Sequence, residues 1–138
     1  MKYNRGKIAK IINCYKFEMI DFYNACPFVF EGEFIDTRKR EVVLWRSVGV
    51  VWKWLGGSSL AEAGKEFHRD HANVIHSIKA IINAYEGYGH PEIVDNIELV
   101  KNKMPMNYYS DDDLWVNYAK NLVRLDELYA KKVKLAEI

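Results

Sequence analysis

SSLAEAGKEFHRDHANVIHSIK, residues 58 to 79, is the most informative part of the sequence, because its pattern predicts two short helices joined by a tight corner. Ser59 followed three residues later by Glu62 is a capping box, which predicts that the first helix begins at Leu60. The residues expected on its buried face are Leu60, Ala63 and Phe67. The first half of the stretch therefore predicts a short helix with one apolar side.

The second helix should begin after Asp70, whose carboxylate can cap it by accepting a hydrogen bond from the amide of Asn73. His68 and Arg69 would form the corner between the two helices. Apolar residues follow at the spacing of one helix face, namely Val74, Ile75, Ile78, Ile81, Ile82 and Tyr85. This spacing predicts one continuous buried stripe along the second helix.

The residues at the start of the second helix are polar or small and would project together from its amino-terminal end. They are Arg69, Asp70, His71, Ala72, Asn73 and His76. In a helix-turn-helix, this part of the recognition helix meets base edges in the major groove of DNA. The stretch therefore predicts a helix-turn-helix within an all-α fold, a compact bundle of five or six helices.

Two blocks of sequence resemble the carboxy-terminal DNA-binding domain of the bacterial replication initiator DnaA, a Trp-repressor-like helical domain. AGKEFHRDHANVIHSIKAI, residues 63 to 81, is similar to the family signature, in which a short helix, a corner with glycine, Arg-Asp-His-x-Thr-Val and Leu-His-Ala follow in that order. TRKREVVLWR, residues 37 to 46, is similar to the basic loop and the long helix that precede the signature. The resemblance covers about residues 36 to 104. It implies sequence-specific binding to double-stranded DNA.

The chain departs from the family pattern at the corner and just after it. The corner is one residue shorter and carries His68 where glycine is expected, and Ala72 and Asn73 stand where the initiator has threonines. We therefore expect a DNA target that differs from the initiator's.

The resemblance also assigns contacts to the basic stretch before the motif. In the family this loop reaches into the minor groove beside the recognition helix, and by position Arg38 would be the inserted residue. Lys39 and Arg40 would lie next to it, and Arg46 would contact a phosphate. Long cationic side chains suit the negative potential of a narrow minor groove.

Three further contacts are expected around the motif itself. The helix end at Ser59 and Leu60 would meet a phosphate. His71 would contact a base or a phosphate, and His76 would contact a phosphate or pack at the edge of the helix. These residues complete the expected DNA surface.

Charge is concentrated around the motif. The chain of 138 residues has a net charge of only +1. Residues 37 to 80, however, hold eight Lys and Arg against four Asp and Glu, a local net charge of +4. Such a local excess attracts phosphate groups.

Residues 39–55 are rich in β-branched side chains, so a strand competes with a helix on propensity alone. Their length and their apolar spacing favour a helix. Asp36 or Thr37 would cap this helix, and Gly56-Gly57 would end it. Helical spacing also predicts helices over residues 7–24 and 91–104.

Alternatives stay open for the segment at 27–36 and for the C-terminal segment. Residues 27–36 fit a packed loop or a short strand equally well. Residues 110–136 predict a helix with a heptad-like seam, which either packs on the domain or pairs with another chain as a homo-oligomer. We thus expect a helical DNA-binding domain over residues 1–106 and a helical arm over residues 107–138.

Cys14 and Cys26 form no CxxC pattern and are too few for a disulfide scaffold, which favours a reducing cytoplasm. The apolar run at the start of the chain is broken by Lys10, Asn13 and Lys16, so we expect no signal peptide. No stretch predicts a membrane span.

Catalysis is not expected from the residues present. The nearest match to a phosphate loop, from Gly57 to Gly64-Lys65, has too long a gap and carries Glu66 in place of Ser or Thr. Histidines gather near the corner, but His68 precedes the helix and does not share a face with the others, so no metal site is expected. The sequence thus predicts neither an enzyme nor a bound cofactor.

Sequence-specific binding to double-stranded DNA, without ATPase activity, is the function that the sequence favours. The resemblance implies a role in replication initiation at an origin, in its regulation or in transcriptional control, for instance in a phage or mobile element. An alternative is an assembly protein of a virus or mobile element, such as a small packaging subunit, that oligomerises through the C-terminal helix.

Overall fold

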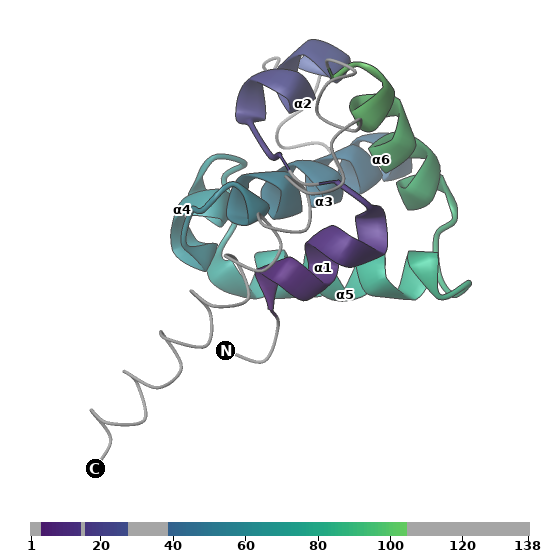
Figure 1. The fold of residues 1–138 in the computed structure, drawn as a ribbon. Helices are drawn as coiled ribbons and strands as arrows, with labels where there is room; N and C mark the ends of the chain where they lie inside the picture. The colour runs from purple at the N-terminus through teal and green to yellow at the C-terminus, as the bar shows by residue number, and fades with distance from the viewer. Residues whose placement is uncertain (1–3, 15, 28–38, 105–138) are drawn as a thin grey trace. The chain divides into compact units, whose positions relative to one another are not determined.

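The structure, a computed structural model, describes residues 4–14, 16–27 and 39–104. All regular secondary structure in these ranges is helical, which confirms the all-α prediction (Figure 1). The helices are α1 (Arg5–Ile12), α2 (Met19–Ala25), α3 (Arg40–Leu55), α4 (Leu60–Lys65), α5 (His71–Tyr85) and α6 (Glu92–Asn102). The chain divides into two units, of which one contains α1 and the other, Lys16–Pro105, contains α2 to α6.

Helix α3 is the centre of the unit formed by α2 to α6, since it contacts each of the other four helices. Its buried residues lie on nearly all sides and are Val42, Leu44, Arg46, Val48, Gly49, Val50, Val51, Trp52, Trp54 and Leu55. Because neighbours cover it so widely, burial of its β-branched side chains offsets their poor helix propensity. The predicted helix over residues 39–55 is confirmed. Its N-cap position is occupied by Lys39, so the predicted cap at Asp36 or Thr37 was wrong.

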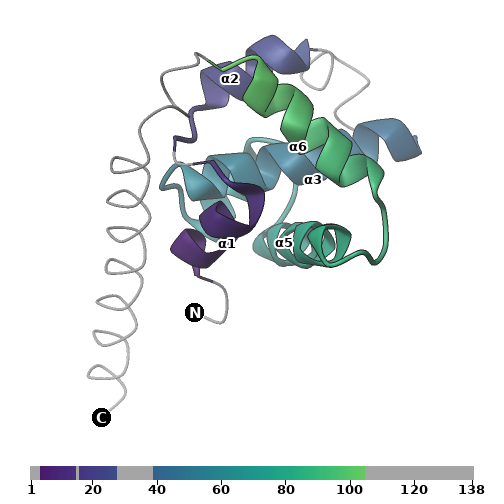
Figure 2. The same cartoon turned by 45° about the vertical axis from the view of Figure 1, so that its right-hand side comes forward.

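Helices α5 and α6 close the core against α3. The apolar stripe of α5 buries Val74, Ile78 and Ile81, and α6 buries Ile93 and Ile97 completely. Figures 1 and 2 show that α6 leads from the end of α5, across α3, to α2. The predicted helix over residues 91–104 is therefore confirmed. Pro91 takes the N-cap position rather than the first helical one.

Helix α2 adds an aromatic layer to α3. The ring of Phe17, just before α2, meets Trp52 edge to face with centroids 5.2 Å apart, and Trp52 Nε1 donates to the Glu18 carbonyl at 3.2 Å. After the helix, the buried thiol of Cys26 donates to the Phe22 carbonyl at 3.1 Å. Burial raises the pKa of this thiol to about 12, so it stays protonated at neutral pH.

The predicted continuous helix over residues 7–24 was wrong, because Asn13 ends α1. Its backbone is left-handed, with φ of 53°, and the amides of Asn13 and Cys14 donate to the carbonyls of Lys10 and Ala9. This bond pair is a Schellman motif, in which a left-handed residue satisfies the last carbonyls of a helix. Asn tolerates that conformation better than most residues, while the apolar spacing simply continues across the break.

The predictions for residues 28–36 and for the C-terminal helix over 110–136 lie outside the described residues. The expected boundary between a domain ending at residue 106 and an arm over 107–138 therefore stays a prediction.

Candidate nucleic-acid interface

The corner between α4 and α5 is built by a second Schellman motif. His68 has φ of +56°, its amide donates to the Lys65 carbonyl at 3.1 Å, and the amide of Arg69 donates to the Gly64 carbonyl at 2.8 Å. These bonds end α4 and turn the chain sharply into α5. The guanidinium of Arg69 adds a bond at 2.9 Å from Nη1 to the His68 carbonyl.

Gly64 allows this corner to be tight. A Cβ atom at Gly64 would lie 2.6 Å from the Arg69 carbonyl oxygen and 2.8 Å from that of Asp70. Only a residue without a side chain leaves the room that the returning backbone needs. The backbone just after the corner is therefore held directly against α4.

Both predicted helix caps on either side of the corner are confirmed. Ser59 Oγ accepts from the amide of Glu62 at 3.1 Å, and Asp70 Oδ1 accepts from the amide of Asn73 at 2.9 Å. Helix α4 begins at Leu60, as predicted. The Ser59 hydroxyl is thus already engaged within the chain, and Leu60 is half-buried.

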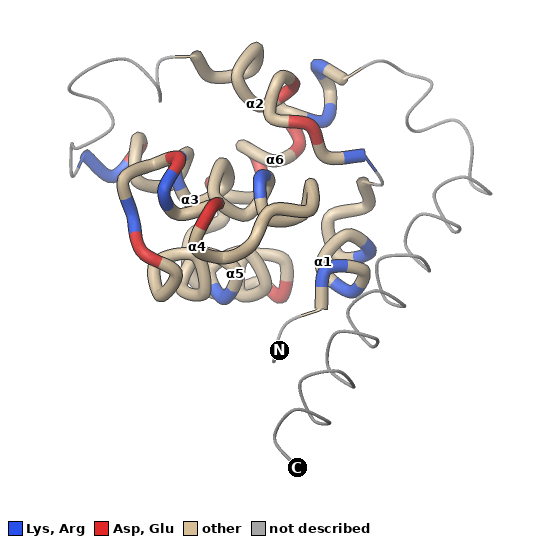
Figure 3. The backbone as a smooth tube through the Cα atoms, turned by 90° about the vertical axis from the view of Figure 1, so that its left-hand side faces the viewer, with Lys and Arg blue, Asp and Glu red and all other residues tan. Residues whose placement is uncertain are grey.

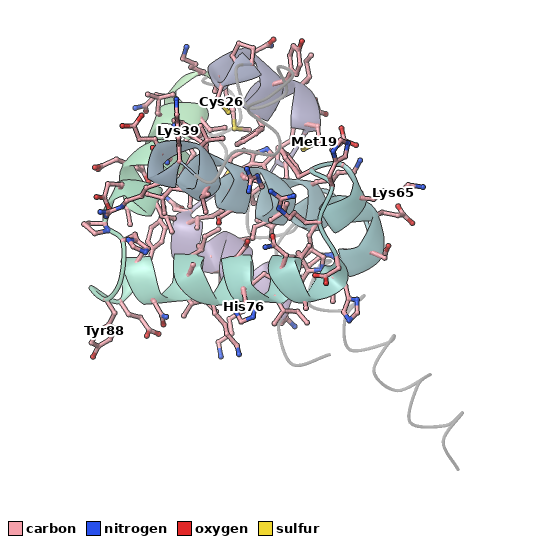
Figure 4. All side chains as sticks on the ribbon, turned by 180° about the vertical axis from the view of Figure 1, so that it is seen from behind. Met19, Cys26, Lys39, Lys65, His76 and Tyr88 are labelled. Atoms are coloured by element: carbon pink, nitrogen blue, oxygen red, sulfur yellow. The ribbon has the colours of Figure 1, made fainter. Side chains whose placement is uncertain are left out.

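The first turns of α5 present an exposed side and a buried side. His71, Ala72 and His76 are exposed, whereas Arg69 and Asn73 are half-buried. Figure 4 shows His76 on the outer side of α5, pointing away from α3. The buried side of the same turns carries Val74, Ser77 and Ile78, which face the core. Of the residues predicted to read DNA from α5, His71, Ala72 and His76 are therefore the accessible ones.

The two acids nearest the corner are held by partners of their own. Glu66 Oε2 lies 2.7 Å from the Nζ of Lys53, near the end of α3, and the Asp70 carboxylate caps α5. Basic and acidic positions alternate around α4 and the corner (Figure 3). Because Lys53 offsets the charge of Glu66, this carboxylate opposes a bound phosphate less than an isolated one would, whereas Asp70 keeps its negative charge.

The basic stretch before the motif lies at the other end of α3. Arg38 is outside the described residues, and Lys39 and Arg40 are exposed at the start of the helix. Arg40 Nη2 forms an ion pair with Glu92 Oε1 at 2.7 Å and approaches His90 Nδ1 at 3.2 Å. A hydrogen bond to its own backbone, together with the Arg40 charge, lowers the pKa of Glu92 from its usual value.

The two groups of predicted contact residues are therefore separate. Arg40 is the first residue of α3. Lys53, which forms the ion pair with Glu66 at the corner, comes thirteen residues later in the same helix. At 1.5 Å per residue this places the two groups about 20 Å apart along α3. Figure 4 shows the same separation, with Lys39 and Lys65 on opposite sides of this unit.

Arg46 does not lie where the resemblance implied. It is only 5% exposed, in the middle of α3, although a phosphate contact requires an accessible guanidinium. The long aliphatic part of arginine can be buried beside apolar neighbours, which the charge of the residue alone does not reveal. We therefore leave Arg46 out of the candidate interface.

Sequence reasoning missed two features of the corner, namely the close backbone approach at Gly64 and the left-handed backbone of His68. A signal for the second was present. Glycine is expected at this position from the sequence analysis, and glycine is the usual residue in a left-handed helix end.

Other kinds of site are not evident in the described part of the chain. Nowhere in these ranges do three or more His, Cys, Asp or Glu side chains gather in a way that could hold a metal ion. None of the helices described is both long and apolar enough to cross a lipid bilayer. Comparison of the chain with models of protein families, with curated proteins and with solved structures found no match.

Proposed function

We propose that α4, the corner and α5 form a helix-turn-helix that binds double-stranded DNA by sequence and without catalysis. The observation that carries this proposal is the amino-terminal turn of α5. It is capped by Asp70, held against α4 by the corner at Gly64, and exposed at His71, Ala72 and His76. A rigidly placed helix start with small or polar exposed side chains fits the major groove.

The spacing of the two candidate groups supports a second contact to the same duplex. Neighbouring major and minor grooves lie about 17 Å apart along the axis, half of a helical turn. The rise of about 20 Å along α3 from Arg40 to Lys53, the partner of Glu66 at the corner, is close to this value. We propose that α5 enters the major groove while Lys39, Arg40 and the preceding Arg38 reach the adjacent minor groove. The exposed ion pair between Arg40 and Glu92 can exchange for a phosphate or groove contact at little cost.

The resemblance to the DnaA carboxy-terminal domain supports the same assignment from the sequence side. Its two blocks, residues 37–46 and 63–81, coincide with the start of α3 and with the α4–α5 segment. On this basis we propose a role in replication initiation, in its regulation or in transcriptional control. The expected divergence at Ala72 and Asn73 gives the protein its own target.

A charge-matched pair of substitutions tests the proposal. Arg69→Ala should weaken binding to a random-sequence duplex at low salt by about tenfold, because Arg69 lies at the start of the proposed recognition helix. Lys103→Ala removes the same charge from the end of α6, close to Cys26 and α2, and should change the affinity less than about twofold. Fluorescence anisotropy gives the affinities, and circular dichroism verifies that both variants are folded.

Two results would count against this proposal. One is the absence of duplex binding by the folded wild-type protein at low salt. The other is an equal loss of affinity in Arg69→Ala and Lys103→Ala, which would mean that any cation on the surface contributes equally.

A further inference from the structure

His68 holds a backbone conformation that favours glycine. Among the described residues other than glycine, a positive φ occurs at Asn13 and at His68, with values of 53° and 56°. Most side chains destabilise this left-handed conformation because Cβ crowds the following carbonyl oxygen. Two other helices end at the same motif position with Gly57 and Gly87, which avoid that crowding.

The corner has glycine at residue 64, where no side chain fits, but not at residue 68, where glycine would stabilise the backbone. At Gly64 a Cβ would collide with backbone atoms, so no side chain fits. At His68 the imidazole is exposed to solvent. A side chain kept at a conformational cost on an exposed turn is characteristic of functional positions.

The surroundings of His68 suit an anion. The acids on either side in the sequence, Glu66 and Asp70, are held by Lys53 and by the amide of Asn73. Lys65, at the end of α4, is exposed. The corner thus combines an exposed imidazole with the cations Lys65 and Arg69, while the charge of Glu66 is offset by Lys53.

We propose that His68 is a DNA-contact residue whose imidazole N–H donates a hydrogen bond to a backbone phosphate beside the groove that α5 enters. This inference rests on the proposed function and adds a residue to its interface. An imidazole has an N–H donor in its neutral and in its protonated form, so the contact does not depend on one charge state. A phosphate contact fixes the position of the recognition helix without reading a base.

Substitution by glycine separates the backbone cost from the contact. His68→Gly in the full chain should raise the melting temperature by roughly 3–6 °C, because the strain at this turn is relieved. The same variant should bind a random-sequence duplex at low salt about fivefold more weakly, the effect of one lost hydrogen bond. Asn13→Gly is the control, since it places glycine at the same motif position at the end of α1; it should raise the melting temperature less, because Asn tolerates this conformation, and should leave DNA affinity unchanged.

His68→Lys completes the test. Lysine restores a phosphate-binding donor but keeps a side chain in the left-handed conformation, so it should retain affinity without the gain in melting temperature. Duplex affinity would then depend on the side chain at residue 68, while the melting temperature would depend on its backbone conformation.

The possible failures are distinguishable. If wild-type protein binds the duplex and His68→Gly binds it equally well, the inference about His68 is wrong and the proposed function stands. A lower melting temperature for His68→Gly would show that the imidazole is kept for packing, which also overturns the inference. If the folded wild-type protein does not bind the duplex, the proposed function and the inference fail together.

Discussion

Replacing Gly64 with alanine tests the close backbone approach at the corner. The new Cβ would meet the carbonyl oxygen of Arg69 at 2.6 Å, whereas ordinary van der Waals contact begins at 3.4 Å. The backbone after the corner must therefore move by about 0.8 Å to make room, and it cannot rotate away as a flexible side chain would. The start of α5 moves with it.

The expected cost follows from two opposing terms. Overpacking of a tight site costs about 1–3 kcal/mol, and a clash with backbone atoms belongs to the upper part of that range. Alanine in place of glycine gains about 1 kcal/mol of helix propensity in α4. The net destabilisation should be about 1–2 kcal/mol, which lowers the melting temperature of a unit of this size by roughly 5–12 °C.

Thermal unfolding followed by circular dichroism measures this cost, and fluorescence anisotropy measures duplex affinity of the folded variant. The control is Ala61→Gly, an exposed position of the same helix, which loses about 1 kcal/mol of propensity without any clash. Gly64→Ala should lose DNA affinity, whereas Ala61→Gly should keep it. A Gly64→Ala protein as stable as the wild type would refute the close approach at the corner.

Three further changes have defined outcomes. Asp70→Ala removes the cap on the Asn73 amide and should cost about 1 kcal/mol in urea unfolding; an unchanged midpoint would mean that the cap contributes nothing. Burial and the Glu18 charge raise the pKa of Asp21 above its ordinary value of 3.8, so its ionised form is disfavoured in the fold, and stability falls as pH rises through that window. Asp21→Asn should therefore stabilise the protein at neutral pH by at most about 0.5 kcal/mol, after allowance for solvent screening, and a gain that persisted well below the ordinary pKa would contradict this cause. Ala72→Thr adds a hydroxyl to the proposed reading surface and should shift base preference by about 1 kcal/mol in competition binding with an unaltered salt slope; an unchanged preference would remove Ala72 from the groove.

The starts of α4 and α5 and the end of α3 could be predicted from the sequence because they depend on local hydrogen bonds and on glycine, whereas the predicted cap of α3 was wrong. Ser59 and Asp70 cap α4 and α5 as their spacing predicts, and α3 ends where Gly56-Gly57 places its end. The break after α1 could not be predicted in this way. Asn13 ends that helix through a backbone conformation, while the apolar spacing that predicts a helix is not interrupted.

Contacts between distant residues were the other part that sequence alone did not supply. The ion pair of Arg40 with Glu92 and that of Lys53 with Glu66 depend on how helices pack, and a basic residue in a helix gives no sign of which partner it meets. Arg46 could not be placed from the sequence for the same reason. Its charge led us to expect it on the surface, but helix packing buries it. The two sides of α5 were predicted in part from the apolar stripe: His71, Ala72 and His76 are exposed and Val74, Ile78 and Ile81 are buried, whereas Asn73, Ile75, Ile82 and Tyr85 are half-buried. The DNA contacts assigned to it stay predictions.

Selection of bound sequences from a pool of random duplexes tests whether α5 recognises DNA by sequence, since it reports binding and sequence preference together. The wild-type protein should enrich one short consensus, and this consensus should change or disappear when the exposed residues His71 and Ala72 are replaced. Folded protein that enriches no sequence over the starting pool, or a consensus that is identical in the variants, would contradict recognition of DNA through the first turn of α5.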